Sequence, residues 1–349
     1  MNGFVGRPRP ASPSRSRSAP RAGAALGCAG LGALALLAGC AAGPSGAPGP
    51  GGPGGAARQA APAARDGLAA VRAGLSGPAR RATFYLALGD SLSIGIQPGP
   101  AGRSVPTAQG YPDLLAARLR RRLPGLRLVK LGCSGETTAT MIHGGTCGYP
   151  AGSQLAQATR FLRARRGRVA LVTIDIGAND PNACVLHARP AAMIGCLYDQ
   201  VPRTERNLRR ILAALRAAAG PRVLIVGMTY YVPELALWRD GPAGRQIALV
   251  TDGFAAVVNH LLAIRYRRFG ARVANVFAAF GSTDFGPALR GARLRAAVTG
   301  RYAGPAPPSV ARICALTWMC PAPPGLPNEH PNAAGYRVIA RTFWQAITG

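Results

Sequence analysis

The amino-acid sequence predicts an α/β fold, a three-layer α/β/α sandwich built on a five-stranded parallel sheet. From about residue 80 onward, short β-rich runs alternate with longer amphipathic stretches, a pattern typical of βαβ units. Several of the short runs are apolar at almost every position, which indicates strands buried on both faces. Such strands need helices above and below the sheet, and these helices supply the two outer layers.

The expected elements follow from these runs in chain order. The strands are solid apolar or β-branched segments: Thr83–Leu88, Arg127–Leu131, Val169–Ile174, Val223–Met228 and Val273–Phe277. The helices have apolar residues three and four apart with arginines facing outward: Tyr111–Leu123, Gln154–Arg165, Arg203–Ala218, Ile247–Phe269 and Ala333–Ile347. Residues 281–327 are rich in Gly and Pro, so we expect a long loop there, near the functional site and stapled by one disulfide.

The N-terminus predicts export. Residues 1–39 carry five Arg and no acid, then an apolar run shorter than the roughly 20 residues of a membrane span, as in a signal peptide. The run ends in Leu37-Ala38-Gly39-Cys40, which resembles the bacterial lipobox and implies lipidation of Cys40. We expect a lipoprotein on the outer face of the cell membrane. A plain signal peptide with release of a secreted protein, or a short signal anchor, is the alternative.

Composition then sets the domain boundaries. The segment 40–78 begins with a Gly-, Pro- and Ala-rich stretch that has almost no large apolar side chains, and it predicts a disordered tether. Residues 79–349 remain as a single folded domain, for which we expect a monomer. The net charge of +29 comes almost entirely from Arg scattered over helix faces, without basic stripes interleaved with aromatic residues. Nucleic acid is therefore not an expected partner.

Six cysteines lie beyond Cys28 and Cys40, and an even number in an exported chain predicts three disulfides. The cysteines fall as three neighbouring pairs, and the simplest pairing joins Cys133–Cys147, Cys184–Cys196 and Cys314–Cys320. Other pairings remain open at this point, and a zinc site is the competing interpretation. It is disfavoured because the sequence has neither a Cys-x-x-Cys pair nor a His-x-x-x-His arrangement. We expect no metal and no cofactor.

Four polar segments follow expected strands or precede the last helix, where functional groups of a parallel sheet collect. A serine or glycine backbone N–H and an asparagine amide can hold an oxyanion, and a histidine can act as a general base. Each segment alone is a weak signal. They are Gly89-Asp90-Ser91-Leu92, Gly132-Cys133-Ser134-Gly135-Glu136, Gly177-Ala178-Asn179-Asp180 and Asn328-Glu329-His330-Pro331.

Together, and in this order from Leu86 to Tyr336, the four blocks resemble the SGNH (GDSL-type) hydrolase family. The resemblance implies the flavodoxin-like sandwich of that family and a serine esterase or lipase that hydrolyses carboxylic esters, lipid or small, without a cofactor. It implies that Ser91 is the nucleophile and His330 the base. It also implies an oxyanion hole made by the Ser91 N–H, the Gly135 N–H and the Asn179 side chain.

The sequence departs from the family at one point. Members usually carry an acid two or three residues before the histidine, where this chain has Asn328 and Pro327. Some members of the family orient the histidine through a backbone carbonyl, which is adequate because holding its tautomer needs an acceptor more than a charge, and we predict a Ser-His dyad here. Glu329 is adjacent to the histidine and would have to fold back to reach the ring. Asp90 is expected to hold its turn and not to act on substrate.

Two rival functions remain open. A carbohydrate O-acetylesterase would share all four blocks. A non-catalytic binding lipoprotein of the same fold would explain the missing acid, but it has no need for the retained base His330. Tyr230, Tyr231 and Trp238 follow the fourth expected strand, where packing is the expected role and lining of an acyl pocket the alternative.

Overall fold

The computed structural model describes residues 69, 71–72, 83–99, 103–182, 184, 190–320 and 328–349, all within the compact unit Ala56–Gly349. The expected signal peptide and Cys40 lie outside these residues, and so does nearly all of the expected tether. Val71, inside the range predicted as tether, is fully buried in the hydrophobic core. Its apolar side chain finds core contacts, so the packed domain begins before residue 79.

Five parallel strands form one sheet in the order β4-β1-β5-β6-β7. The strands are β1 (Thr83–Gly89), β4 (Leu126–Lys130), β5 (Val169–Asp175), β6 (Leu224–Met228) and β7 (Arg272–Ala274). The chain leaves β1 toward β4 and then crosses back to β5 on the other side of β1. This reversal of winding opens a crevice at the carboxyl ends of β1 and β5, where ligands bind in open α/β sheets.

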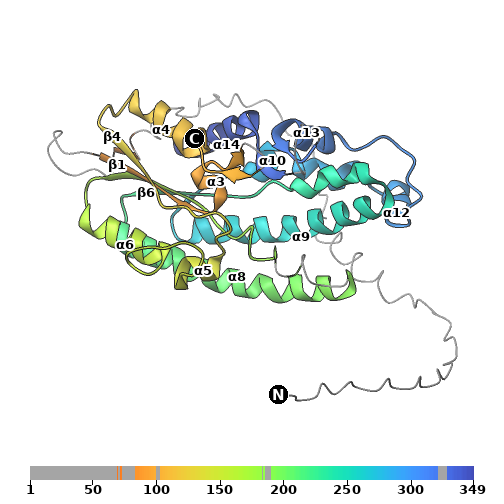
Figure 1. The fold of residues 1–349 in the computed structure, drawn as a ribbon, viewed down its shortest axis with the longest axis horizontal. Helices are drawn as coiled ribbons and strands as arrows, with labels where there is room; N and C mark the ends of the chain where they lie inside the picture. The colour runs from red at the N-terminus through yellow and green to blue at the C-terminus, as the bar shows by residue number, and fades with distance from the viewer. Residues whose placement is uncertain are drawn as a thin grey trace, which may run out of the picture. The chain divides into compact units, whose positions relative to one another are not determined.

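Helices cover both faces of the sheet, which confirms the predicted three layers (Figure 1). Helices α4 (Tyr111–Arg120) and α14 (Ala333–Thr348) pack together on one face, where the Tyr111 and Phe343 rings stack with centroids 4.5 Å apart. Helices α6 (Gln154–Ala164), α8 (Pro190–Ala219) and α9 (Gly241–Arg268) cover the other. Every residue of β5 is buried, as expected for a central strand between two helical layers.

Shorter elements complete the domain. Those nearest the crevice are α3 (Ser91–Ile94), α5 (Thr138–His143), the 3₁₀ helix η3 (Pro233–Asp240) and β9 (Asn328–Pro331). The others are β2 (Gln97–Pro98), β3 (Ser104–Val105), α10 (Val276–Ala279), η4 (Ser282–Asp284), α11 (Phe285–Ala288), α12 (Ala292–Val298), α13 (Pro308–Leu316) and β8 (Thr317–Trp318).

Three sequence predictions were wrong in detail. The fifth strand ends at Ala274, because the Asn275 side chain accepts a hydrogen bond from the Ala278 N–H and starts a helical turn where a strand was expected. Helix α8 begins at Pro190 and continues through Pro202, since one proline removes a single hydrogen bond without ending a packed helix. The expected loop 281–327 contains helices, including α13, which begins at Pro308, a position where proline suits a first turn. Residues 321–327 lie outside the described part.

Three disulfides staple the domain. They join the neighbouring cysteines, Cys133–Cys147, Cys184–Cys196 and Cys314–Cys320. The first closes the loop after β4, the second lies at the start of α8, and the third holds the end of α13 to β8. In the described chain, these bonds are concentrated in the loops and helix ends around the carboxyl edge of the sheet.

Among the described residues, Pro233–Arg268 is long and apolar enough to cross a membrane by length and composition. This segment, η3 and α9, connects β6 to β7, which pair as neighbours in the sheet. One membrane crossing would put the two strands on opposite sides, so their pairing is incompatible with it. In this fold the segment is a covering helix of the sandwich.

Candidate active site

The first strand ends in a turn that presents Ser91. Gly89 has φ +130°, and a Cβ there would lie 1.9 Å from the Asp175 carbonyl oxygen, so the close approach of β1 to β5 requires glycine. The Asp90 side chain accepts a hydrogen bond from the Leu92 N–H at 3.0 Å and caps α3. Ser91 is the first residue of α3, where backbone N–H groups have no partner within the helix. The Ser91 N–H is therefore suited to hold an oxyanion.

Asn179 is held in one orientation by two hydrogen bonds. Its Nδ2 donates to the Glu136 carbonyl oxygen at 3.0 Å, and its Oδ1 accepts from Asn182 Nδ2 at 3.0 Å. An amide nitrogen carries two hydrogens, so one N–H remains for a ligand. Because Gly135 precedes Glu136, the same contact brings the Gly135 turn beside Asn179. Gly135 has φ +78° and lies inside the loop closed by Cys133–Cys147.

Gln154 fastens these two segments together, a role that sequence reasoning missed. The side chain is fully buried at the start of α6. Its Oε1 accepts from the Gly89 N–H at 2.7 Å, and its Nε2 donates to the Gly89 carbonyl at 2.9 Å and to Glu136 Oε2 at 2.8 Å. The nucleophile turn and the Gly135–Glu136 turn are thus bound to one side chain.

His330 lies in β9 and is only 8% exposed. Its Nδ1 lies 2.7 Å from Asn328 Oδ1, and its backbone N–H donates to the same oxygen at 2.9 Å. The other end of the amide, Nδ2, donates to Ser104 Oγ at 3.1 Å. Because a backbone N–H can only donate, the shared atom must be the amide oxygen, and the ring nitrogen beside it must be the donor.

Asn328 therefore fixes the Nδ1–H tautomer and leaves the Nε2 lone pair free to accept a proton. Nε2 is buried and has no hydrogen-bond partner among the described residues. Desolvation by burial lowers the pKa of His330 to about 4, so the ring is neutral at neutral pH. The sequence left the orienting group open, with a backbone carbonyl as one adequate acceptor. In the structure the side-chain carbonyl of Asn328 lies against Nδ1.

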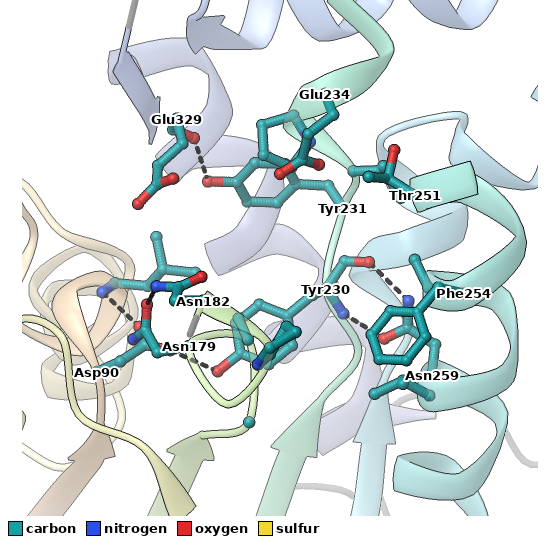
Figure 2. Close-up of a pocket in the computed structure, with 18 of the residues that line it drawn as sticks. Asp90, Asn179, Asn182, Tyr230, Tyr231, Glu234, Thr251, Phe254, Asn259 and Glu329 are labelled. Carbon is teal, nitrogen blue, oxygen red and sulfur yellow. Dashed lines mark hydrogen bonds between the residues drawn. The ribbon is translucent and has the colours of Figure 1, made fainter. Parts of the chain in front are cut away.

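A cavity of about 440 Å³ joins these groups. Ser91, Asn179 and His330 line it together with apolar residues from α8, α9 and η3. Figure 2 shows Asn179 at one side of the cavity and Phe254 of α9 at the other. Gly135 does not line the cavity and reaches it only through the Glu136 contact with Asn179. The apolar wall consists of Leu197, Val232, Pro233, Phe254, Ala255 and Val258. The cavity thus combines polar groups at one end with apolar surface for a substrate chain.

Two buried carboxyl groups support the nucleophile turn from below. The Asp90 N–H donates to Asp175 Oδ2 at 3.2 Å, Tyr230 donates to Asp90 Oδ2 at 2.7 Å, and Tyr111 donates to Asp175 Oδ1 at 2.5 Å. Burial raises the pKa of Asp90 to about 6. Burial and the nearby Asp90 charge raise the pKa of Asp175 well above its usual range. Asp90 is engaged with its own turn and with Tyr230, as expected of a structural residue.

The aromatic residues after β6 divide between two roles. Tyr230 and Tyr231 line the cavity, whereas Trp238 packs edge-on against Phe285 and Tyr302. In the described residues, no group of three or more His, Cys, Asp or Glu side chains is arranged to hold a metal ion.

Comparison with known proteins gave one family match. A family model for the GDSL-like lipase/acylhydrolase family matches residues 87–338. No curated protein matches the chain. Similar solved structures include an extracellular lipase from Streptomyces rimosus, at 20% identity over 76% of this chain and 100% of that one, with a TM-score of 0.49.

Two further similar structures each cover 76% of this chain. A lipase from a goat rumen metagenome is 16% identical over 98% of its own chain, with a TM-score of 0.47. An acetyl xylan esterase from Geobacillus stearothermophilus is 20% identical over 94% of its chain, with a TM-score of 0.40.

Proposed function

The chain belongs to the GDSL-like lipase/acylhydrolase family, and from that premise we propose that it is a serine esterase with Ser91 as nucleophile and His330 as general base. One observation carries the proposal. Ser91, Asn179 and the unpartnered Nε2 of His330 belong to a single cavity, and Asn328 holds the histidine in the tautomer that can take a proton. A hydroxyl, a base and an oxyanion donor in one cavity are the parts that acyl transfer needs.

The reaction proceeds in two halves. His330 Nε2 takes the Ser91 proton as the Ser91 oxygen attacks the ester carbonyl, and the tetrahedral intermediate collapses when the same nitrogen protonates the departing alcohol. A water molecule, activated by His330, then releases the acid from the acyl-enzyme. During both halves the Ser91 N–H and the second Asn179 N–H stabilise the oxyanion, and the Gly135–Glu136 turn holds Asn179 in place.

Asn328 orients His330 as the usual acid of the family would, but it supplies no negative charge. A carboxylate partner would stabilise the imidazolium that forms during attack, and an amide oxygen does so only as a dipole. The advantage is a base with a pKa of about 4, which stays unprotonated in acid. The expected consequence is esterase activity that persists to low pH.

The apolar wall favours an acyl chain longer than acetyl. Leu197, Phe254 and Val258 offer hydrophobic surface that an acetyl group cannot cover, and each buried methylene contributes about 0.8 kcal/mol. This observation supports a lipid or medium-chain ester over a carbohydrate O-acetyl group. The expected result is a rise in kcat/KM from acetyl to butyryl and longer esters of one alcohol.

The test is labelling by an active-site serine phosphonate, with mass mapping of the modified peptide. Labelling at Ser91 that disappears in Ser91→Ala and His330→Ala is the expected result. An unlabelled but folded protein would instead point to a binding module with the same fold.

We also propose that the protein is exported and anchored by a lipid on Cys40. Three disulfides in one domain support an oxidising compartment outside the cytoplasm. Metabolic labelling with a radioactive fatty acid should mark the full chain and be lost in Cys40→Ser. A full chain that takes up no fatty acid but appears in the medium is a secreted protein.

A further inference from the structure

The charged residues that line the cavity are acidic, whereas the chain as a whole is strongly basic. The sequence has 42 Lys and Arg against 13 Asp and Glu. Even so, none of the described residues that line the cavity is Lys or Arg, and three are acids, Asp90, Glu234 and Glu329. A basic protein with an acidic substrate cavity repels anionic ligands there and attracts cationic ones.

Among the described residues, neither Glu234 nor Glu329 forms an ion pair. The ion pairs of the described residues are Lys130–Asp113 and Arg265–Glu205, and neither involves the cavity. Figure 2 shows both glutamates on the same side of the cavity as Tyr231. Desolvation raises the pKa of the Glu234 carboxyl, and the negative charge of Glu329 raises it further. The two carboxylates therefore repel each other, and a cation between them would relieve that repulsion.

Tyr231 gives the same end of the cavity an aromatic surface. Its ring stacks on Phe280 with centroids 4.4 Å apart, and its hydroxyl donates to the Glu329 carbonyl at 2.8 Å. The ring is thus fixed in place where it lines the cavity beside both glutamates. Tyrosine faces attract ammonium and quaternary ammonium groups through the ring quadrupole.

The position of His330 indicates which part of an ester meets these residues. The unpartnered, buried Nε2 is the atom that protonates the leaving alcohol, so the alcohol must lie beside His330. Glu329 lines the same cavity as His330. The apolar wall from α8 and α9, with Leu197 and Phe254, is left for the acyl chain.

We propose that the substrate is an ester whose alcohol carries an ammonium or quaternary ammonium group, which binds between Glu234 and Glu329 against Tyr231. This inference rests on the proposed esterase function of the same cavity and adds no chemical step to it. Polar and charged groups at the alcohol end and apolar groups at the acyl end make the cavity complementary to a cationic alcohol joined to a fatty acyl chain.

The test uses two esters of the same shape, butyrylcholine and 3,3-dimethylbutyl butyrate, in which carbon replaces the charged nitrogen. The expected kcat/KM for the choline ester is at least about tenfold higher, which corresponds to ~1.4 kcal/mol. Because Glu329 is exposed to solvent, added salt should reduce the ratio. Equal rates for the two esters would overturn the inference and leave the esterase proposal standing.

Variants locate the effect. In Glu234→Gln/Glu329→Gln the ratio of the two kcat/KM values should fall to about one, whereas in Asp284→Asn, which removes an exposed acid away from the cavity, it should be kept. A ratio that survives in the double variant contradicts the assignment. Hydrolysis of neither ester, with no phosphonate label on Ser91, would instead reject the esterase itself.

Binding gives a readout that does not need turnover. Calorimetry on Ser91→Ala should show choline binding more tightly than 3,3-dimethylbutanol, with the difference lost when both glutamates are replaced by glutamine. Equal binding of the two alcohols would show that the cavity has no cation subsite, whatever the activity of the enzyme.

Discussion

The exchange Asn328→Asp tests how the base is tuned. Asn328 Oδ1 lies 2.7 Å from His330 Nδ1, and Asp has the same shape as Asn with a charged oxygen in place of the NH2 group. Ser104 Oγ now accepts from Asn328 Nδ2, and its hydroxyl can rotate to donate to a carboxylate oxygen. The substitution therefore places a negative charge beside the imidazole without changing the geometry.

The size of the effect follows from Coulomb's law. A unit charge about 4 Å from the ring's positive charge, at an effective dielectric constant of about 20, stabilises the imidazolium by roughly 4 kcal/mol as an upper bound. Opposite charges at such distances raise a pKa by about one to three units. The pKa of His330 should therefore rise from about 4 into the range of about 5 to 7.

The assay is the pH dependence of kcat/KM for a neutral ester, which reports the base in the free enzyme. Since only neutral His330 accepts a proton, a raised pKa moves the acid limb of the profile to higher pH. The plateau value of kcat/KM for Asn328→Asp should stay within about tenfold of the wild-type value, because the tautomer is preserved. Asn328→Ala is the matched control, and it should lower the plateau instead, because the ring loses its acceptor. If the acid limb of the profile lies near pH 4 in both the wild type and Asn328→Asp, the assigned contact between Asn328 and His330 is refuted.

Three further changes have defined outcomes. Asn179→Ala should lower kcat about 10²- to 10³-fold with little change in KM, measured on a neutral ester; an unchanged kcat would remove Asn179 from the oxyanion hole. Burial raises the pKa of Asp252 to about 7, so its ionisation costs stability as pH rises from about 4 to 7. Denaturant unfolding should show Asp252→Asn more stable than wild type by about 1–3 kcal/mol at pH 8 and equal near pH 4, and a gain at both pH values would contradict this cause. Replacing Cys133 and Cys147 by Ala should lower the free energy of unfolding by about 3 kcal/mol. It should also lower kcat, because the loop that this disulfide closes carries Gly135. A loss of stability with unchanged kcat would show that the Gly135 turn does not contribute to catalysis.

Regular elements with strong periodicity were predicted well. The apolar runs at β1 and β5 and the amphipathic pattern of α4 and α6 have the predicted type, with ends within three residues of those expected. Burial on both faces leaves these segments little choice of structure. Errors arose where a local signal competes with tertiary packing, as at Pro202 inside α8 and in the Pro-rich segment that forms α13.

The candidate site divides in the same way. The four sequence blocks predicted Ser91, Asn179 and His330 as site residues, and the structure brings the three into one cavity. For Ser91 and Asn179 the reason is that parallel strands bring their carboxyl ends to one edge of the sheet. Gln154 carried no recognisable signal, since its partners Gly89 and Glu136 lie on other elements of the chain. Its role depends on distances that no spacing within the sequence contains.

Periodicity and motif spacing are local properties of the chain, and they were enough to predict the sandwich, the family and the residue types available for acyl transfer. Three features became visible in the tertiary structure alone: the Asn328 side chain orients His330, the cavity lining is acidic in a basic protein, and Glu234 and Glu329 line the same cavity. Hydrogen-bond direction, desolvation and charge repulsion depend on how residues far apart in sequence are placed in space.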